Sequence, residues 1–86
     1  MPTISRFYGI DIQMYWNDKH GPHFHAIYAE HRALISLVDS SVLRGGLPTR
    51  AIRLTRQWSR LHRVELLENW ERARLNQELN QIEGLK

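Results

Sequence analysis

The chain contains no cysteine, and this excludes a large class of covalent and metal-binding chemistry. Without thiols there are neither disulfide bonds nor thiolate ligands, so a metal site would have to use histidine, aspartate or glutamate. The absence of cysteine also fits a reducing compartment, and we expect the protein in the cytoplasm.

Long apolar runs are absent as well. The longest, Ala33 to Val38, is too short to cross a bilayer and is interrupted by Ser36. The first residues also lack the apolar core of a signal peptide. The sequence therefore predicts a soluble protein without a membrane partner.

The remaining composition is that of an ordinary globular domain, with 86 residues of which 42% are hydrophobic and 24% are charged. Alternating apolar residues from Ile10 to Trp16 predict a half-buried strand. Residues 23–30 and 32–38 predict two more strands, with Glu30-His31 as the only candidate for the turn between them. Residues 42–44 are a candidate for a short additional strand.

After Leu47 the apolar residues take a helical spacing, and Thr49 is a plausible N-terminal cap. Two apolar stripes follow, one of Ala51, Leu54, Trp58 and Leu61 and one of Leu66, Leu67, Trp70 and Ala73. On ideal helix geometry the second stripe is rotated by roughly 130° from the first. One straight helix could not bury both stripes on one surface, so we predict a break near His62–Val64.

These segments together predict the α+β class. We expect a small antiparallel sheet of three or four strands, followed by two C-terminal helices packed on one of its faces. The chain should form a single domain over residues 1–86. Its sheet region should cover about 4–47, its two helices 48–78, and a frayed tail 79–86.

The net charge of +3 is small but unevenly distributed. Five arginines fall in one window that has no acidic residue, namely Arg50, Arg53, Arg56, Arg60 and Arg63. Arginines at helical spacing form a positive stripe that could follow a phosphate backbone, so these residues are candidates for binding nucleic acid. The alternative is a solvated helix face, since no helix-turn-helix, zinc-finger or RNA-binding sheet motif accompanies the stripe.

Three histidines, His20, His23 and His25, cluster around a Gly-Pro turn. His23 and His25 are two positions apart in a predicted strand, so their rings point to the same face and could hold one divalent metal. His20 is the nearest candidate for a third ligand, and Glu30, His31 and His62 are further candidates.

Two other roles for the histidine pair stay open. His23 and His25 could act as an acid and base without a metal, in a hydrolase or nuclease. Arg6 or Arg32 would then stabilise phosphate charge, and Glu30 is a further catalytic candidate. Alternatively, both histidines are structural and bind the loop backbone.

Several motifs in the chain resemble those of one known family. They are Met14-Tyr-Trp-Asn-Asp, Pro22-His-Phe-His-Ala, Leu47-Pro and His62-Arg-Val-Glu-Leu-Leu-Glu-Asn-Trp. Together they resemble a family of small, mostly bacterial proteins known as domain of unknown function 4160, whose Pro-His-Phe-His motif falls on residues 22–25. In many relatives the loop histidine stands where this chain has Lys19, which makes His20 a weaker candidate for a third metal ligand.

The resemblance implies little about a catalysed reaction and more about binding partners and neighbouring genes. Family members look like stand-alone domains, and some are encoded beside another small protein in an arrangement similar to toxin–antitoxin modules. It therefore implies a binding module that contacts a protein partner encoded nearby, or nucleic acid. The oligomeric state is left open.

Overall fold

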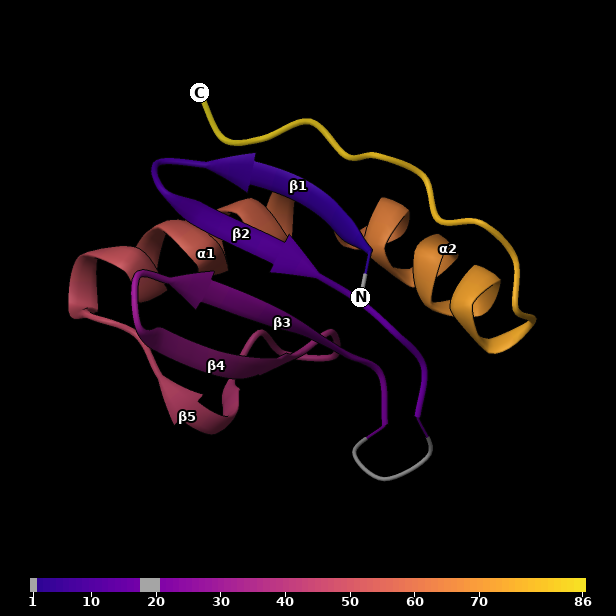
Figure 1. Cartoon of the computed structure of the whole chain (residues 1–86), viewed down its shortest axis with the longest axis horizontal. Helices are drawn as coiled ribbons and strands as arrows, with labels where there is room; N and C mark the ends of the chain where they lie inside the picture. Colours follow the sequence, from indigo (N-terminus) through magenta and orange to yellow (C-terminus); the bar gives the residue numbers. More distant parts are fainter. Residues whose placement is uncertain (1, 18–20) are drawn as a thin grey trace.

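In a computed structural model of the chain, which describes residues 2–17 and 21–86, the strands precede the helices (Figure 1). Within these residues, five strands form one antiparallel sheet in chain order. The elements are β1 (Thr3–Phe7), β2 (Ile10–Gln13), β3 (His23–Tyr28), β4 (His31–Ser36), β5 (Val42–Gly46), α1 (Thr49–Leu61) and α2 (Arg63–Arg74). The α+β class is confirmed, but the sheet has more strands than the three or four expected.

β1 is not among the predicted strands. It pairs with β2 so that Phe7 lies opposite Ile10, which leaves Tyr8 and Gly9 as a two-residue turn. Both turn residues have positive φ, 50° and 78°, as a type I′ hairpin turn requires. Glycine adopts this conformation without strain, whereas tyrosine gives little sequence signal for it.

The hairpin between β3 and β4 turns one residue earlier than predicted. Tyr28 pairs with His31, so Ala29 and Glu30 form the turn rather than Glu30 and His31. Ala29 has a φ of 53°, and neither turn residue is one that usually signals a hairpin.

The two helices are separated at His62, as the rotated apolar stripes predict. Leu66 and Trp70 are buried, but Leu61 is 66% exposed and Leu67 is 41% exposed. The predicted stripes therefore include two residues that face solvent, Leu61 at the end of α1 and Leu67 within α2. Neither helix of the described chain is long and apolar enough to cross a membrane.

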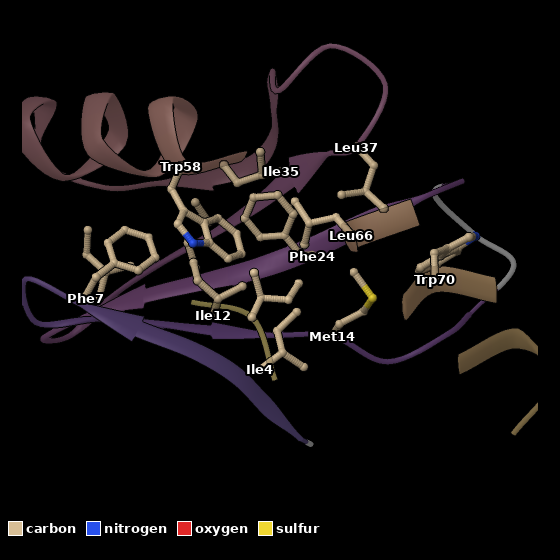
Figure 2. Packing of buried hydrophobic residues seen from close by; sticks show 14 of the residues in the cluster. Ile4, Phe7, Ile12, Met14, Phe24, Ile35, Leu37, Trp58, Leu66 and Trp70 are labelled. Carbon is tan, nitrogen blue, oxygen red and sulfur yellow. The ribbon is translucent and has the colours of Figure 1, made fainter. Parts of the chain in front are cut away.

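The hydrophobic core lies between one face of the sheet and the two helices (Figure 2). Trp58 of α1 is completely buried, with its ring centroid 5.2 Å from Phe7 and 5.9 Å from Phe24. Leu66 and Trp70 bring α2 into the same cluster. Burying these large side chains is the main source of stability in so small a chain.

The C-terminal segment differs from the prediction. α2 ends at Arg74, and residues 79–86, expected to fray, run beside β1 (Figure 1). The N–H of Ile82, a buried residue, donates to the carbonyl of Ile4 at 2.8 Å. Trp58 Nε1 donates to the carbonyl of Glu83 at 2.8 Å. The segment therefore covers the β1 edge of the sheet.

Candidate functional site

The start of β3 gathers aromatic rings around the two motif histidines. The rings of His23 and His25 lie 5.6 Å apart, measured between centroids. Tyr15, just after β2, stacks on His25 at 5.0 Å with an interplanar angle of 19°. Trp70 of α2 lies 5.1 Å from His23. We call these four residues the histidine cluster.

His23 is completely buried and is anchored to the preceding loop. Its Nδ1 lies 2.7 Å from the carbonyl oxygen of Gly21. Because a carbonyl oxygen only accepts, Nδ1 is the protonated nitrogen, and Nε2 carries the lone pair in the neutral ring. This Nε2 and both ring nitrogens of His25 are buried. The arrangement favours anchoring of the loop over contact with a substrate from solvent.

Two of the other catalytic candidates, Glu30 and Arg6, are not brought to the pair. Glu30 lies in the turn beyond the far end of β3, where its Oε1 is 3.7 Å from His31 Nε2. Arg6 lies on β1, two strands from β3, and its Nε is 3.3 Å from Asp11 Oδ1.

The structure also bears on the metal hypothesis. Among residues 2–17 and 21–86, no three histidine or carboxylate side chains are grouped so that they could hold a metal ion. His20, the weaker candidate for a third ligand, lies outside the described residues. The hypothesis that His23 and His25 bind a divalent metal therefore stays a prediction, because the histidine considered as a third ligand is not among the described residues.

The arginine stripe is divided by the structure. Arg50, Arg53 and Arg60 on α1 are exposed, as is Arg63 at the start of α2. We call these four the arginine surface. Arg56 is instead partly buried, and its Nε donates to the carbonyl of Ser40 at 3.0 Å. Arg56 therefore has a structural role in holding the β4–β5 connection against α1.

Within the described residues, no acidic side chain neutralises the charges of the arginine surface. α1 contains no acidic residue, and no member of the surface makes an ion pair within the described chain. At the C-terminal end of α2 the arrangement is the opposite, because Arg74 contacts Glu71 through two hydrogen bonds at 2.8 and 3.2 Å. The Arg74 guanidinium lowers the pKa of Glu71 below its usual value, chiefly through this side-chain hydrogen bond.

A third feature lies on the sheet face that the helices do not cover. A groove of about 240 Å³ is lined by His25, Arg32, Leu34, Arg44 and Gly45, and we call it the sheet groove. Arg32 was a sequence candidate for phosphate contact, whereas Arg44 was not. Only the pairing of Leu34 with Arg44 across β4 and β5 brings Arg44 to this place.

These features define a small α+β protein with a histidine pair at the start of β3, of which His23 is completely buried, and an unpaired arginine face on its first helix. The chain belongs to the family described as Domain of unknown function (DUF4160), which matches residues 9–71. The match includes the histidine cluster and all of α1. No curated protein and no solved structure matches the chain.

Proposed function

We propose that the protein is a binding module that contacts a polyanionic partner, nucleic acid in the first place, through the arginine surface. One observation carries this proposal. Arg50, Arg53 and Arg60 stand exposed on a helix without an acidic residue and have no ion-pair partner in the described chain. Like charges at helical spacing repel one another, so this arrangement is relieved when an anion binds.

The chemistry of arginine suits such a partner. A guanidinium presents a planar fork of donors that matches phosphate oxygens, and neutralising phosphates releases counterions from the nucleic acid. The glutamates of α2 are not available for α1, because each lies close to another side chain. Glu65 contacts His62, and Glu68 and Glu71 lie close to Arg72 and Arg74. The positive potential is therefore concentrated on the first helix.

The test is a binding titration of labelled duplex DNA and single-stranded RNA at several salt concentrations. The triple variant Arg50→Gln, Arg53→Gln, Arg60→Gln should bind at least about tenfold more weakly than wild type at low salt. The logarithm of the binding constant should also fall less steeply with the logarithm of the salt concentration. The difference in slope should correspond to the loss of up to about three phosphate contacts. The matched control is the double variant Arg72→Gln, Arg74→Gln, which removes arginines that are already paired and should bind like wild type.

We further propose that the protein acts as one member of a toxin–antitoxin-like pair. The support is the family membership together with a positively charged face that an acidic protein surface would complement. Co-expression with the product of the adjacent gene, followed by purification of one tagged member, tests the pair. If the two proteins do not associate and no nucleic acid binds, the function as a binding module is refuted.

A hydrolase or nuclease that uses His23 and His25 remains the rival. Its support is the 5.6 Å separation of the two rings, which is short enough for joint action on one group. Burial of the ring nitrogens weighs against it. RNA cleavage by the wild-type protein that disappears in His25→Gln, with or without a bound divalent metal, would establish this rival in place of a simple binding role.

A further inference from the structure

The sheet groove is built by the register of three strands. Leu34 of β4 lies opposite His25 of β3 on one side and opposite Arg44 of β5 on the other. Leu34 is only 7% exposed, yet it is not part of the core cluster that includes its neighbours Ala33 and Ile35. Alternation along β4 therefore turns Leu34 to the face without helices, where it forms an apolar floor.

Two glycines shape the same groove. Gly46 lies opposite Arg32, and a Cβ atom at Gly46 would meet nothing within 4 Å, so the space beside Arg32 is open. Gly45 has a φ of +71°, and a Cβ there would lie 2.2 Å from the carbonyl oxygen of Arg32. Only glycine allows β5 to approach β4 this closely while the groove remains open.

The register also places Arg32 and Arg44 diagonally across β4 and β5, within reach of one ligand. Both are exposed, and neither has an ion-pair or side-chain hydrogen-bond partner in the part of the chain that the structure describes. Arg6 lies on the same face of the sheet but is paired with Asp11. The guanidinium N–H donors of Arg32 and Arg44 are therefore available for a ligand, whereas the guanidinium of Arg6 is engaged by Asp11.

We infer that the sheet groove binds a small phosphomonoester that carries a planar apolar group, of which a nucleoside monophosphate is the simplest example. Two guanidinium groups match the dianionic charge of a phosphomonoester, whereas a monocarboxylate offers only one charge. The planar group would lie on Leu34 and on the ring carbons of His25, because both nitrogens of His25 are buried. This site is independent of the arginine surface and of the function proposed for it.

The test is a titration of the isotope-labelled full chain with adenosine 5′-monophosphate, followed by NMR. Signals of Leu34, Arg44 and Gly45 should shift and saturate. Inorganic phosphate should produce the same pattern with weaker affinity, and adenosine should produce none below its solubility limit. Arg32→Gln and Arg44→Gln should each weaken binding by about tenfold or more, since each removes a charge-assisted contact.

Arg6→Gln is the matched control, because it removes an arginine from the same sheet face outside the groove, and its affinity should equal that of wild type. The triple variant of the arginine surface should also bind the monophosphate normally, which separates this site from the proposed nucleic-acid surface. The inference is overturned if the ligand shifts no groove signal at millimolar concentration. It is also overturned if Arg32→Gln and Arg44→Gln, with unchanged spectra in the free state, bind as tightly as wild type.

Discussion

The Nδ1 of His23 donates a hydrogen bond to the carbonyl of Gly21, and at 2.7 Å this contact joins the first residue of β3 to the loop before it. The ring is completely buried against Trp70 and Tyr15. A buried imidazole with a fixed donor direction is a structural anchor whose removal leaves a cavity and frees the loop.

His23→Ala should therefore destabilise the protein by about 2–5 kcal/mol, the range for truncating a large buried side chain. Chemical denaturation monitored by tryptophan fluorescence measures this, since Trp70 contacts the histidine directly. His31→Ala is the control, because His31 is exposed and its removal should change stability by less than about 0.5 kcal/mol. Equal effects at the two positions would contradict the anchoring role.

The fold was predictable where periodicity was strong. The alternation from Ile10 onward and the rotation of the two helical stripes both have direct counterparts in β2 and in the break at His62. β1 was not predictable in this way, because its register shifts between Thr3 and Ser5 and it is followed by a turn at a tyrosine with positive φ. A strand of this kind is stabilised by its partners rather than by its own pattern.

The candidate site was predictable only in part. The two-residue spacing of His23 and His25 correctly indicates neighbouring rings, but spacing carries no information about burial, which depends on Tyr15 and Trp70 from elsewhere in the chain. Arg44 joins Arg32 in the sheet groove only through the register of β5 on β4. Such a relationship between strands cannot be inferred from one strand's sequence.

The C-terminal segment makes a specific contribution to stability through Ile82. This side chain is 5% exposed and its N–H pairs with Ile4, so Ile82→Ala should cost about 2–5 kcal/mol in the free energy of unfolding. Leu75→Ala provides the control, because Leu75 is 54% exposed and should tolerate truncation. Urea unfolding of both variants decides the matter, and a fully stable Ile82→Ala protein would show that the segment is not packed on β1.

The pair of Glu71 and Arg74 predicts a pH dependence. The pKa of Glu71 is lowered from its ordinary value of 4.5 by its hydrogen bond with Arg74. Because the unfolded state then binds the proton more readily, the pair stabilises the fold above the ordinary pKa, and this stabilisation is lost as the pH falls through the lowered value. Arg74→Gln should return the pKa of Glu71 toward 4.5, as measured by NMR of the carboxyl carbon.

The same titration contains an internal control. The pKa of Glu83 is lowered chiefly by a side-chain hydrogen bond with Lys86, so it should be unaffected by Arg74→Gln. A pKa of Glu71 that stays equally low in Arg74→Gln would show that the two side chains do not interact in solution.

Gly45 and Gly46 are adjacent in β5, and the structure predicts that the same substitution destabilises the protein at Gly45 and has little effect at Gly46. Gly45→Ala adds a Cβ that would lie 2.2 Å from the Arg32 carbonyl oxygen, at a φ of +71° that disfavours alanine. The expected cost is about 1–3 kcal/mol, because the backbone of β5 must move away from β4. The Cβ atom that Gly46→Ala adds would meet nothing within 4 Å, so this variant should change stability by less than about 1 kcal/mol.

Thermal or urea denaturation of the Gly45→Ala and Gly46→Ala variants tests the prediction. Equal stabilities would mean that β5 does not approach Arg32 as described, and the shape of the sheet groove would then be wrong.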